Sequence, residues 1–226
     1  MNNRLFAVGD IHGCSDAFQK LVENEIEIKK SDKLILLGDY IDRGFQSKEV
    51  VDYIIDLQHK GFDIVPLMGN HEAMLLDTID NKEHISRWIW NGGNKTLESF
   101  GVNSLEDLDQ LYKSFFKTLQ YYYSFNDFLF VHAGFNDEII NPFSDKYQMI
   151  WARREKYLHG SLIDKTIVHG HTPITQTHCK EIIQSNSRVI NIDTGCVYTD
   201  RIGYGYLSAL ELYSMKLFQI SNSSFN

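Results

Sequence analysis

With 226 residues, the chain is long enough to bury a sizeable core, and we expect a single domain over residues 1–226. Its 43% hydrophobic and 23% charged residues are ordinary for a globular protein and exclude a disordered chain. The formal net charge of −8 argues against a protein that wraps nucleic acid.

The first 70 residues alternate short apolar runs with amphipathic segments. This pattern predicts a βαβαβ unit with strands at 5–8, 34–37 and 64–68 and helices at 15–27 and 46–60. We expect Ser15 to cap the first helix and Gly61 to end the second. Apolar strands joined by helical crossovers favour an α/β fold on a parallel sheet covered on both faces.

From about residue 75 to about residue 120 the pattern is mostly helical, and we interpret this stretch as an insertion. Trp88 and Trp90 lie in its middle, where packing between the insertion and the sheet is the favoured interpretation. Beyond it, short apolar runs predict strands at 121–125, 128–131, 166–168, 182–184, 189–192, 207–212 and 215–220.

The cysteine content and the hydropathy of the chain indicate in which cellular compartment the protein is expected. The three cysteines have spacings that match neither a zinc ribbon nor a disulfide framework, which suits a reducing environment. No window approaches 18 apolar residues, and the first apolar run is too short for a signal peptide. We therefore expect a cytoplasmic protein with no membrane partner. Its oligomeric state is left open.

Six of the predicted strands run into a short segment that holds a glycine and a side chain able to bind a metal ion. The six segments are Gly9–Gly13, Gly38–Gly44, Gly69–Glu72, His132–Gly134, His169–Thr172 and Asp193–Gly195. The carboxyl ends of strands in open α/β sheets form the ligand crevice, so these segments should converge. A single turn of glycine and aspartate usually has only a structural role, but this set of segments, in this order, predicts a functional site.

The side chains of these segments indicate a chemistry. Imidazole nitrogens mixed with carboxylate and amide oxygens suit Mn, Fe or Zn, whereas oxygen ligands alone would indicate Mg or Ca. We favour a dinuclear site, because one carboxylate can bridge two ions about 3.5–4 Å apart and a bridging hydroxide is then available near neutral pH. Arg43 can bind the oxygens of a tetrahedral phosphate.

The chain resembles the calcineurin-like metallophosphoesterases in five of these motifs, namely GDIHG at 9–13, GDYIDRG at 38–44, GNHE at 69–72, HAG at 132–134 and GHT at 170–172. The motifs are most similar to the phosphoprotein phosphatase branch in its short bacterial and phage form, over residues 4 to about 212. The resemblance implies a four-layer α-β-β-α sandwich with a helical insertion and an active site at the carboxyl ends of the strands.

The resemblance also implies a set of metal ligands. Two divalent ions are expected, with Mn as the first expectation and Fe or Zn as the alternatives. One ion would be held by Asp10, His12 and Asp39. Asp39 would bridge to the second ion, whose other ligands would be Asn70, His132 and His171.

Further residues would act on the phosphate. His71 resembles the general acid that protonates the leaving oxygen, and Asp42 would orient it. Arg43 and one of two adjacent arginines would bind phosphate oxygens, and the spacing of the motif favours Arg153 over Arg154. The resemblance implies in-line attack by a metal-bridging hydroxide, without a phosphoenzyme.

Two departures from the family pattern bear on the site. Many relatives have a second histidine where this chain has Pro173, so His171 is expected to bind metal and His169 only to support the site. Asp193 is expected to act through hydrogen bonds. The long tyrosine-rich segment 198–206 is interpreted either as a wall of the substrate groove or as a hairpin tip.

The resemblance implies hydrolysis of phosphoserine and phosphothreonine in proteins. A hydrolase of dinucleoside polyphosphates or of another small phosphoester is the alternative, because relatives with those substrates carry nearly the same motifs. A nucleic-acid phosphodiesterase is disfavoured, since no basic track for a phosphate backbone is visible. An inactive binding module is disfavoured because the predicted ligands, acid and clamp are all present.

Overall fold

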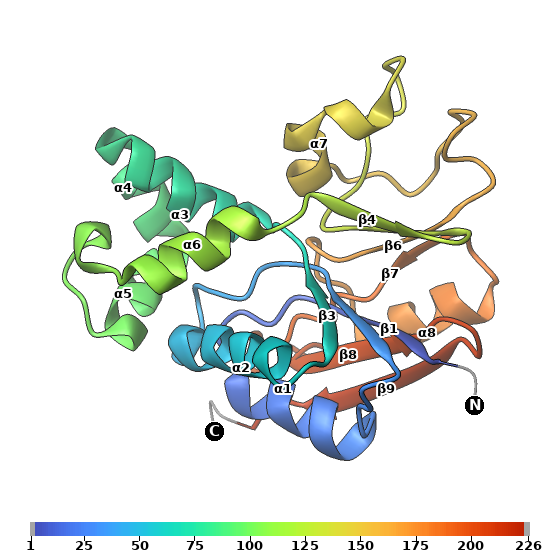
Figure 1. Cartoon of the computed structure of the whole chain (residues 1–226). Coiled ribbons are helices and arrows are strands. Elements are labelled where there is room, and N and C mark those ends of the chain that lie inside the picture. Colours follow the sequence, from blue (N-terminus) through green and yellow to red (C-terminus); the bar gives the residue numbers. More distant parts are fainter. Residues whose placement is uncertain (1–2, 224–226) are drawn as a thin grey trace.

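The computed structural model describes residues 3–223, which form two β-sheets with helices around them (Figure 1). The first sheet has the strand order β3-β2-β1-β8-β9. Its strands are β1 (Leu5–Val8), β2 (Lys33–Leu36), β3 (Asp63–Pro66), β8 (Tyr206–Glu211) and β9 (Lys216–Ser221). β1, β2 and β3 are parallel, whereas β8 and β9 extend the sheet in antiparallel fashion.

The second sheet has the order β4-β5-β6-β7. Its strands are β4 (Tyr122–Phe125), β5 (Phe128–Val131), β6 (Thr166–His169) and β7 (Val189–Asn191), of which β4 alone runs antiparallel to its neighbour. Side chains alternate between the two faces of a strand. Leu5 and Ala7 of β1 accordingly meet Phe130 and Val168 of the second sheet in one buried cluster. The two sheets therefore pack face to face.

Helices cover the outer faces. Phe6 of β1 points away from the second sheet and packs with α1 (Ser15–Lys20), which continues as a π-helical turn at Leu21–Glu25, and with α2 (Ser47–His59). On the other side, Val131 packs with Met149 of α7 (Lys146–Trp151). The order of layers is helix, sheet, sheet, helix, and the predicted α/β sandwich is confirmed.

A group of helices projects beside the first sheet, at the left of Figure 1, and we call residues 70–118 the helical lobe. It contains α3 (Asn70–Asp80), α4 (Ile85–Trp88), α5 (Asn94–Phe100) and α6 (Gln110–Thr118), joined by short turns at Lys82–His84, Ile89–Gly93 and Leu105–Asp107. Trp88 and Phe115 share a buried cluster with Phe18 of α1. The single domain stays a prediction, which this shared cluster supports.

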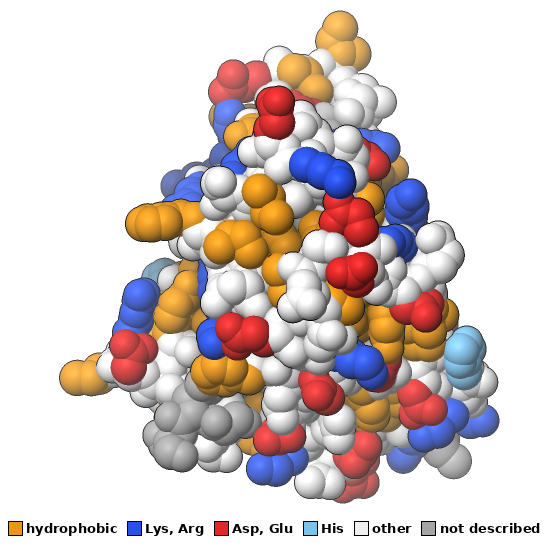
Figure 2. Space-filling view, turned by 90° about the vertical axis from the view of Figure 1, so that its left-hand side faces the viewer, with side chains coloured by type: hydrophobic (Ala, Val, Ile, Leu, Met, Phe, Trp, Pro, Cys, Tyr) orange, Lys and Arg blue, Asp and Glu red, His pale blue; other side chains and the backbone are white. Residues whose placement is uncertain are grey.

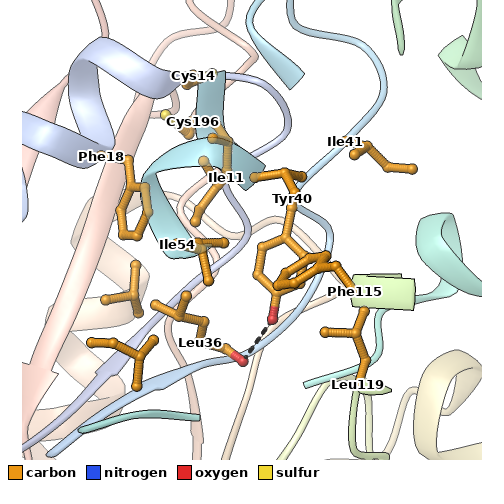
Figure 3. Close-up of a cluster of buried hydrophobic side chains, with 14 of the residues drawn as sticks. Ile11, Cys14, Phe18, Leu36, Tyr40, Ile41, Ile54, Phe115, Leu119 and Cys196 are labelled. Atoms are coloured by element: carbon orange, nitrogen blue, oxygen red, sulfur yellow. Dashed lines mark hydrogen bonds between the residues drawn. The ribbon is translucent and has the colours of Figure 1, made fainter. Parts of the chain in front are cut away.

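Tyr40 connects the lobe to the loop after β2. Its hydroxyl donates to the carbonyl of Leu67 at 2.7 Å, and the carbonyl of Leu36 is also within reach at 3.2 Å. Its ring lies edge-on to Phe115 of α6, with the centroids 6.3 Å apart (Figure 3). The segment that carries the GDYIDRG motif is thus fixed by a buried side chain of its own.

Three local expectations were wrong. Trp90 is 90% exposed and does not pack between the lobe and the sheet, whereas Trp88 is buried as expected. Residues 182–184 belong to helix α8 (Gln176–Gln184) and not to a strand, because Thr175 caps the helix and Cys179, Ile182 and Ile183 share a helical face that packs against the cluster between the sheets. Ser15 is the first residue of α1 and not its cap, which is Cys14. Gly61 has a φ of 80° directly after the end of α2, as a helix stop requires.

The surface of the lobe carries charges of both signs. Figure 2 shows this side of the molecule, where acidic and basic side chains alternate and apolar side chains lie between them. Among residues 3–223, no helix is both long enough and apolar enough to cross a bilayer.

Candidate metal centre

The loops after β1, β2, β3, β5 and β6 bring the predicted site residues together. Five of these residues, His12, Asp39, Asp42, Arg43 and His171, have positive φ angles of 46°, 51°, 69°, 68° and 70°. Residues other than glycine rarely adopt this left-handed conformation, which persists only where the surroundings fix it. Such a concentration of strained backbone is typical of a functional site.

Two motif glycines let the loops approach each other closely. A Cβ atom on Gly170 would lie 2.1 Å from Oδ1 of Asp10, and one on Gly69 would lie 2.2 Å from Oδ1 of Asp39. Any larger residue would displace one of these carboxylates. The glycines of the motifs therefore seat the two aspartates.

One group of ligand atoms comprises His12, Asp39 and His71, whose atoms all lie within 4.8 Å of one another. The Nδ1 atom of His12 donates to the carbonyl of Ile41 at 2.9 Å, which turns Nε2 toward Asp39 Oδ2 at 3.4 Å. Burial, with help from Arg43, lowers the pKa of His12 and keeps the ring in the neutral form that binds metals. This group contains His71 where Asp10 was predicted.

A second group comprises Asp39, His132 and His171. His132 donates through Nδ1 to the carbonyl of Leu37 at 2.9 Å, so its Nε2 atom faces the site. The Oδ1 atom of Asn70 lies 2.9 Å from that Nε2 atom and 3.0 Å from Nδ1 of His171. Asp39 belongs to both groups, which is the arrangement that a bridging carboxylate requires.

Asp10 lies beside these groups. Its carboxylate is buried and accepts hydrogen bonds from the backbone amide of His171 at 3.1 and 3.2 Å. Burial, together with the negative charges of Asp193 and Asp39, raises the pKa of Asp10 well above its usual value. Burial likewise raises the pKa of Asp193 to about 7, although its Oδ1 atom accepts from the Gly195 amide at 2.9 Å.

The burial of these groups tests whether metal ions fit here. Three buried polar atoms have no hydrogen-bond partner within residues 3–223, namely His71 Nε2, His171 Nε2 and Asp193 Oδ2. Unpartnered buried atoms and neighbouring carboxylates both cost free energy. Divalent cations would neutralise the neighbouring carboxylates and accept lone pairs from the neutral imidazoles of the two ligand groups. The residues present therefore fit a pair of divalent ions.

Arg43 brings a positive charge to the same place. Its Nη1 atom lies 2.6 Å from Nε2 of His12, and its guanidinium lies 5.9 Å from the ring centroid of Tyr198. Burial opposes ionisation of Asp39, but the imidazoles around it and Arg43 outweigh burial and hold the pKa of Asp39 below its usual value. Arg43 therefore lies at the first group of ligand atoms.

Asp42 is held from two directions. Its Oδ2 atom accepts from His71 Nδ1 at 2.7 Å and from the indole of Trp88 at 2.9 Å, and its Oδ1 atom accepts from the Thr96 hydroxyl at 2.5 Å. All four side chains are buried. The predicted pairing of His71 with Asp42 is present, and two residues of the lobe that were not assigned to the site complete it.

Glu72 organises the loop after β2. Its carboxylate accepts hydrogen bonds from the backbone amides of Asp39, Tyr40, Ile41 and Gly69 at 2.7 to 3.3 Å. Burial, with the nearby charges of Asp39 and Asp42, raises its pKa to about 8. Nothing in the sequence beyond its place in GNHE indicated this role, because three of its four partners lie more than 30 residues away.

The two candidate arginines differ in their surroundings. Arg154 donates to Glu138 at 2.5 Å on the surface. Arg153 follows Trp151 by two residues, and the Trp151 ring lies edge-on to His171 with the centroids 5.7 Å apart. Arg153 therefore stays the predicted second clamp, as the spacing of the motif suggested.

The structure locates His169 and the segment 198–206, neither of which was predicted to bind metal. His169 belongs to neither ligand group, and its Nδ1 atom donates to the carbonyl of Gly170 at 3.1 Å, while burial lowers its pKa to about 4. It lines a small pocket with Ile174 and His178. In the segment 198–206, the ring of Tyr198 faces Arg43, which favours the interpretation as a wall of the groove.

Comparisons with known proteins agree with this geometry. A family profile described as calcineurin-like phosphoesterase matches residues 4–198. A symmetrical bis(5'-nucleosyl)-tetraphosphatase of Pseudomonas syringae pv. syringae is 27% identical over 171 residues, which is 75% of this chain and 55% of that protein. The asymmetrical bis(5'-nucleosyl)-tetraphosphatase PrpE of Anoxybacillus flavithermus is 26% identical, over 96% of this chain and 93% of that protein. The chain thus spans about half the length of the first relative and most of the second.

Solved structures share the arrangement of layers. A proposed diadenosine tetraphosphatase has a TM-score of 0.71 at 19% identity and covers 99% of this chain, with 96% of its own chain matched. A serine/threonine phosphatase from Saccharomyces cerevisiae has a TM-score of 0.69 at 14% identity over 99% of this chain and 80% of its own. At these identities the likeness shows the fold alone.

Proposed function

Since the chain belongs to the calcineurin-like phosphoesterase family, we propose that it is a dinuclear metal-dependent hydrolase whose substrates are dinucleoside polyphosphates. One observation carries the dinuclear part of the proposal, namely that the carboxylate of Asp39 belongs to both groups of ligand atoms. The two curated relatives described above are named as tetraphosphatases, and this supports the substrate class. The protein phosphatase activity expected from the motifs becomes the second candidate, favoured by the GDYIDRG segment.

Six side chains would hold the ions. Mn is the proposed metal, with Fe or Zn as the alternatives. Two ions here would make water a nucleophile near neutral pH and neutralise charge on phosphate oxygens. The first ion would be held by Asp10, His12 and Asp39, and the second by Asp39, Asn70, His132 and His171.

The other residues act on the substrate directly. Arg43 and Arg153 bind the oxygens of the reacting phosphoryl group and hold it in place for in-line displacement. His71 donates a proton from Nε2 to the leaving oxygen, because its Nδ1 atom is engaged by Asp42 and its Nε2 atom has no other partner among the described residues. Asp42 keeps the ring in this orientation and stabilises its protonated form.

A substrate comparison tests the proposal. We expect the manganese-loaded protein to hydrolyse a dinucleoside tetraphosphate faster than phosphoseryl, phosphothreonyl and phosphotyrosyl peptides. Removing a metal ligand should abolish turnover, so Asp39→Asn should lose activity by at least about a hundredfold. Asp63→Asn is the matched control, since Asp63 is an exposed partner of Lys33. Faster turnover of a phosphopeptide would favour the second candidate, and no hydrolysis with Mn, Fe or Zn would refute the enzyme itself.

A further inference from the structure

The seven arginines of the chain fall into two sets. Three are tied to oxygen acceptors elsewhere on the molecule: Arg4 to Asp32, Arg154 to Glu138, and Arg188 to the carbonyl of Asp164. The guanidinium groups of the other four have no oxygen acceptor within the part of the chain that the structure describes, and these are Arg43, Arg87, Arg153 and Arg201. These four guanidinium groups therefore keep their donors available for an anion.

All four of these arginines lie at or next to the candidate metal centre. Arg43 contacts His12, and Arg153 lies two residues after Trp151, whose ring packs edge-on to His171. Arg87 and Arg201 each contact an aromatic ring that in turn contacts a residue of the centre. The site is therefore surrounded by more positive charge than one phosphoryl group requires, since Arg43 and Arg153 already account for its oxygens.

Arg87 reaches the centre through Trp151. The ring of Trp151 lies edge-on to His171, with the centroids 5.7 Å apart, and the guanidinium of Arg87 lies 5.3 Å from the Trp151 centroid. Arg87 belongs to α4 in the helical lobe, whereas Trp151 ends α7 on the second sheet. The contact between Arg87 and Trp151 therefore connects the helical lobe to α7, next to the group of ligand atoms that contains His171.

Arg201 occupies the corresponding place on the side of His12. Its guanidinium lies 4.3 Å from the ring centroid of Tyr198, and Arg43 lies 5.9 Å from the same ring. The ring of Tyr198 thus contacts both an arginine at the metal centre and an exposed arginine. A guanidinium that is held against an aromatic ring loses less freedom when it binds an anion. Both outer arginines are exposed and can receive one.

We propose that Arg87 and Arg201 bind the phosphates that adjoin the reacting one, so that the site selects linear polyphosphate chains over phosphomonoesters. This inference rests on the proposed function, which it deepens by assigning the residues that determine specificity. A monoester presents a single phosphoryl group to Arg43 and Arg153. A polyphosphate chain carries further negative charge on neighbouring phosphates, which planar guanidinium groups bind through paired hydrogen bonds.

The test compares two substrates in the manganese-loaded enzyme, a dinucleoside tetraphosphate and p-nitrophenyl phosphate. In Arg87→Gln and in Arg201→Gln, we expect the ratio of kcat/KM for the tetraphosphate to that for the monoester to fall about tenfold, mainly through KM. Arg188→Gln is the matched control and should keep the ratio of the wild type, because Arg188 contacts a carbonyl of another loop. An unchanged ratio in both variants would overturn the inference while the proposed function stands.

A binding measurement separates this inference from the proposed function. Calorimetry would compare orthophosphate with a methylene-bridged dinucleoside tetraphosphate, which resists hydrolysis. Tighter binding of the analogue that both glutamine variants weaken about tenfold supports the inference, even if the wild type hydrolyses no tetraphosphate and the proposed function fails. Equal binding of analogue and orthophosphate by the wild type would overturn the inference.

Discussion

At the scale of single residues, the orientation of the proposed proton donor depends on side chains from outside its own motif. Asp42 orients His71, and Asp42 is itself held by the indole of Trp88 and the hydroxyl of Thr96. A hydrogen bond to an ionised acceptor contributes roughly 1.5–3 kcal/mol. Trp88 is therefore a positioning residue as well as a core residue.

Replacing Trp88 with phenylalanine keeps most of the buried ring and removes the N–H group. We expect kcat to fall about tenfold for phenyl phosphate, whose leaving oxygen needs a proton, and to fall less for p-nitrophenyl phosphate. Steady-state kinetics on both esters measure the difference. Trp90→Phe is the control, because Trp90 is 90% exposed. An equal fall for both esters would show that the indole only supports the fold.

Much of the candidate site could be predicted from its sequence motifs. The rest could not, for a physical reason. Asp39, His132 and His171 were named from strand endings, and they meet in one group. The roles of Trp88 and Thr96 were not predicted, because their hydrogen bonds span 46 and 54 residues and leave no local pattern. The apolar character of Trp88 indicated burial, which is correct, but not the partner of its N–H group.

At the scale of elements, one side chain joins a helix to a loop. Glu72 lies in the first turn of α3, where it accepts the amide of Gly69 and three further amides from the loop after β2. The start of α3 and the loop that carries Asp39 are therefore fixed relative to each other. This coupling aligns Asn70 and His71 with Asp39.

Glu72→Gln should break this coupling, since an amide offers one acceptor oxygen where the carboxylate offers two. Buried N–H groups left without an acceptor cost about 1–3 kcal/mol, so we expect the free energy of unfolding in urea to fall by about 2 kcal/mol. Glu49→Gln provides the comparison, because Glu49 accepts an exposed hydrogen bond from Ser99 and should change stability by less than about 0.5 kcal/mol. Equal losses in the two variants would contradict the proposed coupling.

The accuracy of the predicted elements varied with the strength of their pattern. β1, β2 and β5 lie within one residue of the predicted ranges, because continuous apolar runs flanked by glycine indicate buried strands clearly. α8 was missed because Ile182 and Ile183 form too short an apolar run to separate a strand from a helix. α7 was not predicted either, and its six residues give little periodicity.

At the scale of the whole molecule, the metal centre lies where the two sheets meet. Asp10, His12 and Asp39 follow strands of the first sheet, whereas His132 and His171 follow strands of the second. Ions bound between them would link the sheets, and anything that binds only the folded state stabilises it. The stability of the protein should therefore depend on metal.

Chelation tests this dependence. We expect EDTA to lower Tm by about 5–10 °C for each ion that was present at a hundredfold excess over its dissociation constant, and added Mn to restore it. Asp39→Asn should melt at the same temperature with and without Mn, whereas Asp63→Asn should behave as the wild type. A wild-type Tm that is insensitive to both EDTA and Mn would contradict a centre shared between the sheets. Differential scanning calorimetry provides the measurement.

The hydrogen bond from the His171 amide to Asp10 spans 161 residues, and this separation determines how much time passes between the synthesis of the two residues. At about 5–20 residues per second, a ribosome makes His171 roughly 8–30 s after Asp10. For most of that interval the nascent chain carries Asp10, His12 and Asp39 without the complete set of ligands for the second ion. Durable capture of both ions therefore awaits the synthesis of His171.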